Sequence, residues 1–470
     1  MAQILAMRYE ILPERYCREF SNLFDRVRPL AEKEIRSVFL QEFGKFPENI
    51  FQRFSYEPLA SASFGQVHSA ILDGQKVAVK VQRPGVSILA EADTAILKGL
   101  SVLVGVLFVT PVNLQDAMRE WENWTRRELD YRKEADSAVR LRNLSTYTDI
   151  YIPKVYKNIS TSRILIMEFL EGVNLNEVMQ RNIVELSPAE KKVICRKIVR
   201  GLLLDYFKSG FFHADPHPGN IIILKNGGLS WVDFGIMGEG GSASQGYHFA
   251  NFIKYSSEES VSRAVSHLKD FMNGLKLGIG AVDLKFNWRG KSPKRIARGI
   301  MKFLDYRLGK IIKRWALHVI DPKVGLAMRS TARHFLDLIS EARGFGMEIP
   351  TNLLSFIRSV VITDMVCLVL DPQFNMKEEL HLFFEDYPEI CNPPDRADFS
   401  SIKSPVSTLI ASRASEPKTV NLDNSEEGFE RKGEEKQRIL ERYIEQASRI
   451  MERILEEGSR GLAYFATTKI

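Results

Sequence analysis

Two aspartates and an asparagine stand at a spacing that could support phosphoryl transfer. Asp215 and Asn220 lie five positions apart, and 13 positions after Asn220 comes Asp233, the first residue of an Asp-Phe-Gly triplet. Transfer of a phosphoryl group from ATP requires an aspartate that orients the acceptor hydroxyl and oxygen ligands for Mg²⁺, with few other contributions from the protein. The spacing therefore predicts a phosphoryl-transfer site. The structural alternative is an Asx-turn loop between two strands.

A lysine on a predicted strand could supply the cation for nucleotide phosphates. Val77-Ala78-Val79-Lys80 matches the strand lysine of protein kinases. The segments 66–72 and 76–82 flank Asp73-Gly74, which is a strong signal for a two-residue hairpin turn. We therefore expect two paired strands that carry Lys80 inward.

The segment before these strands aligns with the glycine-rich phosphate loop of kinases. Its residues are Ala60, Ser61, Ala62, Ser63, Phe64, Gly65, Gln66 and Val67. Alanine replaces two of the usual glycines, and only Gly65 remains. Alanine carries a Cβ that disfavours positive φ and holds the backbone farther from a phosphate. The loop therefore predicts an altered nucleotide preference in place of the usual tight phosphate cradle.

Several motifs together resemble the UbiB/ADCK atypical kinase family, over roughly residues 3–375. They are Pro58–Ser63, Gln66–His68, Val79–Gly85, Glu128–Tyr131 with Glu134-Ala135, and His213–Asn220. The resemblance implies an α+β, protein-kinase-like bilobal fold with a small strand-rich N-lobe, a helical C-lobe, extra N-terminal helices and a C-terminal helical appendage. It also implies an atypical kinase or ATPase that uses ATP or ADP with Mg²⁺ and supports isoprenoid-quinone or lipid metabolism at a membrane.

The resemblance assigns catalytic roles to individual residues. Lys80 would contact the nucleotide phosphates and pair with Glu134, in a helix expected to begin near Trp121. The remaining assignments are Asp215 at the place of the kinase base, and Asn220 and Asp233 at the places of the metal ligands. Lys80, Glu134 and Asp215 therefore form the predicted catalytic set.

A nucleotide-binding set follows from the same resemblance. It comprises Ala60, Ser61, Ala62, Ser63, Phe64, Gly65, Val67, Lys80 and Glu168. Glu168 belongs to this set because Arg163–Phe169 looks like the strand that leads to the hinge between the lobes. Backbone groups just after that strand would face the adenine. A plain core strand is the alternative.

The chain departs from the family pattern at a second acidic motif. Glu128 and Asp130 match the family's E-x-D, whose usual partner is a lysine in an N-terminal K-x-G-Q motif. Here Gln3 falls on the motif's Gln and Ala2 replaces its Gly, but the lysine is absent. Either the natural start is shortened or this chain begins late. If the lysine is absent, the two acids lose their expected cation, and the contact expected to gate the pocket is lost.

Two further features argue against regulation of the usual protein-kinase kind. Ala214 occupies the position at which regulated kinases carry an arginine that pairs with a phosphorylated loop. No Ala-Pro-Glu triplet follows Asp233-Phe234-Gly235, and Gly238–Gly241 replaces the ordinary substrate-binding segment. We therefore expect neither activation by loop phosphorylation nor a peptide substrate. A small molecule, a lipid, or ATP hydrolysis coupled to movement fits better.

Periodicity and composition divide the chain into predicted parts. They are an N-terminal helical extension at 1–50, a kinase-like N-lobe with a helical insert at 51–175, a kinase-like helical C-lobe at 176–390, a disordered linker at 391–436 and an amphipathic helix at 437–470. The last helix has an apolar stripe that needs a cover. Docking on the kinase-like body, pairing with another protein and contact with lipid all stay open.

One segment is strongly basic. Residues 273–314 hold twelve Lys or Arg against Asp283 and Asp305, a local net charge of +10 where the whole chain has +6. Apolar residues recur every three or four positions from Ile296 to Trp315, which predicts a basic amphipathic helix. Such a helix could lie on an anionic membrane or bind a phosphorylated ligand. Equally, its apolar stripe could pack on the large lobe and leave a solvated basic face.

Composition indicates a reducing compartment and a peripheral relation to a membrane. The four cysteines lie far apart and show no pairing pattern. The most apolar run, 99–110, reaches about 12 residues, whereas a spanning helix needs about 20, so we expect a buried helix and no transmembrane helix. No signal peptide is indicated. These features predict a cytoplasmic protein, or one of the mitochondrial matrix or plastid stroma in a eukaryote, that associates peripherally with a membrane.

The histidines do not indicate a zinc site. His213 and His217 have the spacing of helix ligands, but Pro216 and Pro218 prevent the helix that would align them. His213 is instead expected to brace the catalytic loop. No other arrangement of nucleophile, histidine and acid stands out in the chain.

The sequence thus predicts an ATP-binding, Mg²⁺-dependent atypical kinase or ATPase. A nucleotide-binding pseudokinase scaffold for quinone- or lipid-synthesis enzymes is one alternative, and a lipid-binding module is another. Expected partners are a nucleotide, an anionic membrane or a lipid or quinone precursor, and proteins of quinone or lipid biosynthesis; no nucleic acid is expected. The presence of Lys80, Glu134, Asp215, Asn220 and Asp233 favours the enzyme, because a scaffold has no need of all five.

Overall fold

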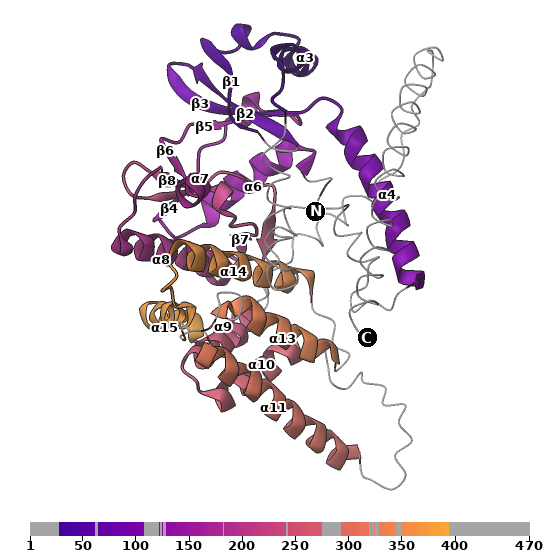
Figure 1. The fold of residues 1–470 in the computed structure, drawn as a ribbon, viewed down its shortest axis with the longest axis vertical. Helices are drawn as coiled ribbons and strands as arrows, with labels where there is room; N and C mark the ends of the chain where they lie inside the picture. The colour runs from indigo at the N-terminus through magenta and orange to yellow at the C-terminus, as the bar shows by residue number, and fades with distance from the viewer. Residues whose placement is uncertain are drawn as a thin grey trace, which may run out of the picture. The chain divides into compact units, whose positions relative to one another are not determined.

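The computed structural model describes most of the chain between residues 28 and 393. The gaps are 62–63, 108–121, 123–124, 126–127, 182, 241–242, 275–292, 319–320, 322–323, 325–328 and 345–349. The chain divides into two compact units, Met1–Arg83 with Asp130–Lys403, and Pro84–Leu129 with Ser404–Ile470. Figure 1 labels the elements along the described chain. The predicted helix at 437–470 and nearly all of the predicted linker lie outside the described residues.

An antiparallel sheet forms the N-terminal part of the first unit. Its strands run in the order β1 (Arg53–Ser61), β2 (Gly65–Leu72), β3 (Gln75–Gln82) and β5 (Ile164–Glu168). The helix α3 (Glu32–Phe43) and a 3-10 turn at Pro47–Asn49 precede it. Asp73 and Gly74 connect β2 to β3 with φ values of 48° and 76°. This pair of left-handed residues confirms the predicted hairpin.

The side chains of β3 alternate between the two faces of this sheet. The three valines of β3 are fully buried and pack against α3 in one apolar core. Because successive side chains of a strand point to opposite faces, Lys80 lies on the other face. Lys80 is paired across the sheet with Val67 of β2 and Leu165 of β5. The strand period thus directs Lys80 inward, as predicted.

The helix α6 (Tyr131–Leu144) packs beside β5 and brings Glu134 to that face. Asp130 is its N-cap, and the Asp130 side chain accepts a hydrogen bond from the backbone N–H of Arg132 at 3.2 Å. The predicted start near Trp121 was therefore wrong for the helix that carries Glu134. The helix begins only at Tyr131 because the backbone of Asp130 is extended, with φ −127° and ψ 95°, and a helix cannot continue through an extended residue.

Short strands position the segment from His213 to Asp233. A second sheet contains β4 (Ile150–Tyr151), β9 (Leu229–Trp231), β8 (Ile221–Leu224) and β6 (Gly172–Asn174), in that order. The strand β7 (Phe211–His213) pairs with β10 (Met237–Glu239). The strands β8 and β9 form a hairpin between Asn220 and Asp233. At its base, the N–H of Val232 donates to the carbonyl of Asn220 at 3.1 Å, so the two ends of the hairpin lie side by side.

Helices dominate the rest of the first unit. Their bounds are α7 (Leu175–Arg181), α8 (Pro188–Leu204), α9 (Ala243–Ser257), α10 (Val261–Gly274), α11 (Pro293–His318), α13 (Thr331–Gly344), α14 (Thr351–Leu370) and α15 (Met376–Asp386), with short helical turns at Lys157–Ile159, Asp205–Ser209, Pro218–Asn220 and Pro388–Cys391. Buried side chains of α8, α9, α11, α14 and α15 meet in one large apolar core. The described fold is thus mixed α+β, with antiparallel sheets toward the N-terminus and helices toward the C-terminus, as predicted.

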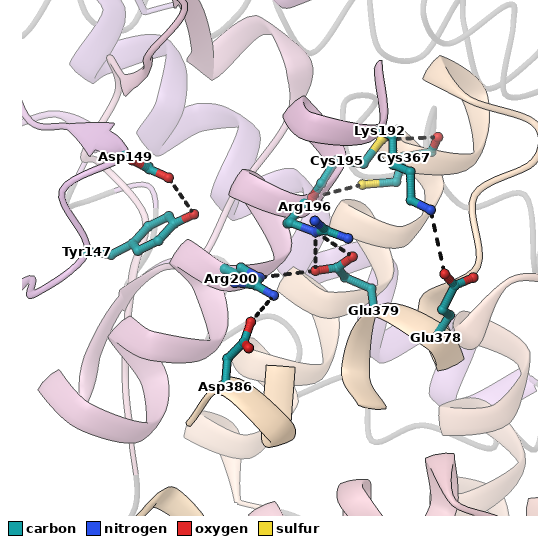
Figure 2. Close-up of polar contacts among 10 residues, drawn as sticks. All are labelled: Tyr147, Asp149, Lys192, Cys195, Arg196, Arg200, Cys367, Glu378, Glu379 and Asp386. Carbon is teal, nitrogen blue, oxygen red and sulfur yellow. Dashed lines mark hydrogen bonds and ion pairs between the residues drawn. The ribbon is translucent and has the colours of Figure 1, made fainter. Parts of the chain in front are cut away.

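Polar contacts tie α8 to α14 and α15 beside this core (Figure 2). Arg196 and Arg200 of α8 both contact the Glu379 carboxylate of α15, with N–O distances of 3.2 Å. Beside them, Cys195 of α8 and Cys367 of α14 each donate an S–H to the other's backbone carbonyl. These contacts hold α14 and α15 against α8.

The described side chains of α11 pack their apolar stripe into the protein. The buried members are Leu308, Ile311, Ile312 and Trp315. Two of the basic residues pair with acids of α13, Arg307 with Glu341 at 3.0 Å and Arg314 with Asp337. From Asp305 onward, the stripe therefore packs on the helical part and the basic face is solvated. The side chains of residues 293–304 lie outside the description.

Two apolar helices bear on the prediction that no transmembrane helix is present. The helix α4 (Val86–Leu107), in the second unit, holds most of the apolar run 99–110, but side chains 100–110 lie outside the description. Among the described residues, the stretch Asn352–Leu370 of α14 has the length and apolar composition to cross a membrane. It is 72% buried inside the protein, as a core helix is. Sequence inspection missed this longer helix because Arg358 and Asp364 interrupt its apolar run.

Candidate phosphoryl-transfer site

Three residues from distant parts of the sequence meet at the Lys80 ammonium. Lys80 Nζ lies 2.8 Å from each carboxylate oxygen of Glu134 and 3.1 Å from Asp233 Oδ2. Lys80 comes from β3, Glu134 from the first turn of α6, and Asp233 from the loop after β9. The sheet, the helix and the hairpin thus bring together the predicted lysine, its predicted partner and a predicted metal ligand.

Burial and charge shift the pKa values of these two carboxyls in opposite directions. Glu134 is 3% exposed, and this burial raises its pKa to about 7, although Lys80 opposes the shift; the charge of Asp233 adds to it. For Asp233, burial also disfavours the charged form, but Lys80 and the N–H of Gly235 outweigh burial and lower the pKa. The Lys80 ammonium therefore pairs with two carboxylates, so negative charge at this site exceeds the positive charge of Lys80. The excess negative charge would favour binding of a divalent cation.

Oxygen donors suited to Mg²⁺ lie at the two ends of the β8–β9 hairpin. Asn220 Nδ2 donates to the carbonyl oxygen of Asp215 at 3.0 Å and to Asp215 Oδ2 at 3.3 Å. These contacts use the amide nitrogen of Asn220, so its amide oxygen could serve as a ligand, and Asp233 follows at the other end of the same hairpin. Mg²⁺ is commonly held by one or two carboxylates together with the substrate phosphates. The donor set therefore fits Mg²⁺ that arrives with a nucleotide.

His213 braces this loop, as predicted. Its Nε2 donates to the backbone carbonyl of Asp233, and its Nδ1 accepts from the N–H of Asp215 at 3.2 Å. The ring stacks on Trp231 with centroids 4.6 Å apart. Because Nδ1 is an acceptor, the imidazole is neutral, and burial accordingly lowers its pKa. His213 thus joins the backbone of Asp233 to that of Asp215.

The segment between His213 and His217 is not helical, as the two prolines predicted. His217 caps the 3-10 turn Pro218–Asn220, where its Nδ1 accepts from the N–H of Gly219 at 3.0 Å. Over the described residues, no three His, Cys, Asp or Glu side chains gather in a group that could hold a metal ion. A bound cation would therefore depend on the Asn220 amide and on phosphate oxygens as well as on Asp233.

The segment aligned with the phosphate loop joins β1 to β2. Ala60 and Ser61 are exposed at the end of β1, where they pair with Val67 and Gln66, while Ala62 and Ser63 lie outside the described residues. Phe64 is half-buried, and its carbonyl accepts from the N–H of Arg83 at 2.9 Å. The loop residues that the structure describes thus lie at the strand ends that adjoin β3.

Gly65 is required here by a close approach and not by positive φ. A Cβ on Gly65 would overlap the Tyr131 hydroxyl and lie 2.8 Å from the carbonyl of Val81. Tyr131 is 1% exposed, and the Lys80 ammonium lies 5.0 Å from the centre of its ring. Sequence inspection missed this role of Tyr131, although its position directly after Asp130 of the E-x-D motif was a signal.

The carboxylate of Glu168 accepts hydrogen bonds from other groups of the protein. Glu168 Oε2 accepts from the Tyr151 hydroxyl at 2.7 Å and from the N–H of Lys154 at 3.0 Å. The residue ends β5, paired with Val77 of β3. A role in binding the nucleotide base would therefore fall to backbone groups at this strand end, as the sequence suggested, and not to the carboxylate.

Asp130 has a cation in the first turn of α6. Arg132 donates to its two carboxylate oxygens at 2.9 and 3.0 Å, and these hydrogen bonds lower the pKa of Asp130. Arg132, two residues later in the first turn of α6, thus gives Asp130 a cation from within the helix. The expected contact between the acidic motif and an N-terminal lysine stays a prediction. Residues 1–27, which contain the matched Gln3, lie outside the description.

The segment after Asp233-Phe234-Gly235 is held by unmodified side chains and backbone. The strand β10 pairs with β7, with Met237 opposite His213. Arg140 of α6 forms an ion pair with Glu239 of β10 at 2.7 Å and stacks on Phe211 of β7 at 4.0 Å. A phosphate is therefore not needed to hold this segment beside α6.

This arrangement of sheet, lysine–glutamate pair and catalytic loop defines a kinase-like fold. The model of the ABC1 atypical kinase-like domain matches residues 22–265, more than half of the chain, so the chain belongs to the ABC1 atypical kinase-like family. Relatives of the chain carry the names ABC1 kinase and ABC1 family protein, which confirms the UbiB/ADCK resemblance.

Individual relatives cover part of the chain. It is 36% identical over 248 residues to ACTIVITY OF BC1 COMPLEX KINASE 8 of Arabidopsis thaliana, a chloroplastic protein, covering 51% of this chain and 32% of the relative. It is 34% identical over 232 residues to an ABC1 family protein of Schizosaccharomyces pombe, covering 48% of this chain and 43% of the relative. The chain therefore spans less than half the length of these two relatives.

A solved structure is similar over most of the chain. The complex of Rv3197 with erythromycin from Mycobacterium tuberculosis matches with a TM-score of 0.52 and 22% identity, covering 84% of this chain and 92% of that one. At this identity the likeness bears on the fold alone. Together with the family match, it confirms the predicted kinase-like α+β fold.

Proposed function

We propose that the chain is an ATP-binding, Mg²⁺-dependent atypical kinase or ATPase. The observation that carries this proposal is the Lys80 ammonium, 2.8 Å from Glu134 and 3.1 Å from Asp233. These partners lie 54 and 153 positions from Lys80 in the sequence. Phosphoryl transfer depends almost entirely on positioned charges of this kind, because the protein contributes little covalent chemistry. Membership of the ABC1 atypical kinase-like family supports the same function.

Each side chain has a distinct task in this proposal. Lys80 would keep its contact with Glu134, which orients it, and would leave Asp233 to contact the nucleotide phosphates. Asn220 and Asp233 would hold Mg²⁺, which would supply positive charge to the transferred group. Asp215, held by the Asn220 amide, orients the acceptor hydroxyl or water.

The acceptor we propose is a small molecule, a lipid or water, in support of isoprenoid-quinone or lipid metabolism. Support comes from the segment after Asp233-Phe234-Gly235. It forms the short strand β10 against β7 and is tied to α6 by Arg140. In protein kinases, by contrast, this segment is ordered by phosphorylation of the activation loop.

A pseudokinase scaffold for quinone- or lipid-synthesis enzymes is the second candidate. The observation that favours it is the direct contact of Lys80 with Asp233 at 3.1 Å, because phosphate or metal could bind these two side chains only after this contact is broken. A scaffold would bind nucleotide without turnover. An enzyme must break this contact on every cycle.

We also propose that the protein works beside an anionic membrane. One face of α11 exposes Tyr306, Lys310, Lys313 and Leu317, at spacings of four, three and four residues. Tyr306 is 67% and Leu317 66% exposed. An aromatic ring, an aliphatic side chain and two lysines on one helix face suit the boundary between headgroups and acyl chains. The chloroplastic relatives support a plastid stroma as the compartment, with the cytoplasm or the mitochondrial matrix as the other choices.

Phosphate release separates these functions. The native chain, Asp233→Asn and the control Asp136→Asn are assayed with Mg²⁺ and ATP, with and without anionic liposomes. Asp136 lies on α6, two residues after Glu134, but its side chain is exposed and paired with Lys157, so Asp136→Asn should leave the site intact.

If the chain is an enzyme, we expect phosphate release to be retained in Asp136→Asn and lost in Asp233→Asn. Nucleotide binding without turnover in the native chain would instead identify the scaffold. Liposome binding that is indifferent to nucleotide, with neither nucleotide binding nor turnover, would identify a lipid-binding module.

A further inference from the structure

The helix α14 carries two charged residues in a mostly apolar sequence, Arg358 and Asp364. Asp364 is buried and accepts hydrogen bonds from the Ser330 hydroxyl at 2.8 Å and the Thr331 N–H at 2.6 Å. It therefore serves the start of α13, which is a structural task. Arg358 instead donates from Nη2 to the backbone carbonyl of Ala214 at 2.9 Å. A cation in an apolar helix lowers stability unless its partner compensates.

This contact holds the peptide group that directly precedes Asp215. That group is planar, and it joins the carbonyl of Ala214 to the N–H of Asp215. Its oxygen accepts from Arg358, and its N–H donates to His213 Nδ1 at 3.2 Å. The two polar atoms of one rigid plane are thus held by side chains of α14 and β7. Holding both constrains the direction in which the Asp215 side chain leaves the backbone.

The other side of Ala214 is held as well. Its N–H donates to the carbonyl of Ile236 at 3.0 Å, just after Asp233-Phe234-Gly235. Both backbone polar groups of Ala214 therefore bind elements remote in sequence, and Arg358 is 144 positions away. Position 214 is an alanine, so the guanidinium that contacts this loop comes from Arg358 of α14. Figure 1 shows α14 beside α8, in the helical part next to β7.

We propose that Arg358 is a positioning residue for Asp215, which holds the Ala214–Asp215 peptide group in the orientation that the acceptor requires. The proposal rests on the phosphoryl-transfer function proposed above. Arg358 touches neither nucleotide nor metal ligand in this account and acts through the backbone of the loop. Its loss therefore lowers kcat and leaves nucleotide affinity intact, since Lys80 and Asp233 are unchanged.

A matched control is available in Arg329. This residue is 6% exposed and donates to the backbone carbonyls of Pro372 at 2.7 Å and Phe374 at 3.2 Å. It makes the same kind of contact as Arg358, a guanidinium on a main-chain oxygen, away from Asp215. Methionine is the informative replacement for both, because it keeps an unbranched, flexible side chain without the guanidinium and favours a helix.

The test compares the full chain with Arg358→Met, Arg358→Lys and Arg329→Met. Phosphate release gives kcat and KM for ATP, thermal melting gives Tm, and amide hydrogen exchange reports on a peptide spanning residues 211–220. We expect Arg358→Met to lower kcat about 10- to 100-fold with KM changed less than about twofold, the scale of a small misplacement of reacting groups. Lysine keeps one donor for the carbonyl and restores part of kcat. Exchange at the Asp215 amide rises about tenfold in Arg358→Met, since a loosened peptide group opens more often.

Arg329→Met shows what the loss of a purely structural arginine does. We expect it to lower Tm but to leave kcat per folded molecule and hydrogen exchange in residues 211–220 unchanged. The proposal is overturned if Arg358→Met behaves like Arg329→Met. It is also overturned if KM rises as much as kcat falls. Should the native chain bind nucleotide without turnover, the proposed function fails, and the exchange at Asp215 alone decides whether Arg358 positions this loop.

Discussion

Gly65 and Tyr131 share one small space beside the phosphate loop, where the Tyr131 hydroxyl takes the place that a Cβ on residue 65 would need. Gly65→Ala is therefore predicted to lower the free energy of unfolding by about 1–3 kcal/mol, the usual cost of overpacking a fitted site. Nucleotide affinity should fall as well, because Tyr131 also lies against Lys80. Urea unfolding and titration with a fluorescent ATP analogue measure the two effects.

The double variant Gly65→Ala with Tyr131→Phe provides the control. Removing the hydroxyl relieves the closest overlap, although the Val81 carbonyl, 2.8 Å from the added Cβ, keeps some strain. We predict that the double variant is more stable than the sum of the single changes by about 1 kcal/mol, as for residues in direct contact. Strict additivity would contradict the contact.

Glu134→Gln is predicted to separate stability from activity. Burial raises the pKa of Glu134 to about 7, so above that pH the folded chain carries a charge that its surroundings disfavour. The neutral amide should raise the free energy of unfolding at pH 8 by about 1–3 kcal/mol, since each pKa unit corresponds to about 1.36 kcal/mol and the raised pKa already includes the effect of Lys80. Turnover should fall at least about tenfold, because Lys80 loses the charge that orients it.

Glu171→Gln is the control for that change. Glu171 pairs with Lys225 at 2.7 Å but both side chains are exposed, so neither stability nor turnover should change measurably. If Glu134→Gln kept full turnover, the Lys80–Glu134 pair would have no part in the chemistry. Unfolding by urea at pH 8 and phosphate release supply both readings.

Asp205 gives the folded chain a pH dependence unrelated to the site. Burial raises its pKa to about 7 from the usual 3.8. Between these values the folded state keeps a proton that the unfolded state has lost, so this group makes stability fall as pH rises from about 4 to about 7. Asp205→Asn should remove that slope. Its free energy of unfolding, relative to that of the native chain, should therefore rise by about 3 kcal/mol from pH 5 to pH 8.

Unfolding curves at the two pH values test this, with Asp136→Asn as the exposed counterpart, for which no such gain is expected. Equal slopes in the native chain and Asp205→Asn would show that Asp205 ionises normally in the folded protein.

The exposed face of α11 predicts binding to anionic vesicles. Lys310→Glu with Lys313→Glu should weaken partitioning onto vesicles rich in anionic lipid by at least about 30-fold, since each lysine near such a surface contributes about 1 kcal/mol and each new glutamate adds repulsion. Lys33→Glu with Lys45→Glu makes the same change in net charge at exposed sites elsewhere and should have little effect. Vesicle sedimentation at low and high salt provides the measurement. Equal losses in the two pairs would refute a specific face.

Local patterns were enough to predict much of this site. The two-residue period of β3 directs Lys80 inward, and Asp73-Gly74 sets the hairpin that pairs its strand. The spacing of Asn220 and Asp233 follows from the β8–β9 hairpin, whose ends lie side by side. In each case the contact lies within one strand or one hairpin, so a short stretch of sequence is enough to predict it.

Contacts across long separations left no such local signal. Arg358 reaches Ala214 over 144 positions, and nothing near either residue shows that they meet. The start of α6 was misplaced because the capping role of Asp130 depends on its extended backbone, which its place in an acidic motif does not reveal. Likewise α14 was overlooked as an apolar helix, since its two charges are satisfied by distant partners.

The central claim is that Lys80, Asn220 and Asp233 converge on one nucleotide and its metal ion. A crystal structure of the chain with a non-hydrolysable ATP analogue and Mn²⁺, recorded for anomalous scattering, tests it most directly. The account predicts an Mn²⁺ peak within about 2.2 Å of oxygens from Asn220 and Asp233, with the Lys80 ammonium moved from Asp233 to the phosphates while it keeps Glu134. A nucleotide bound elsewhere, or Mn²⁺ that touches neither residue, would contradict it.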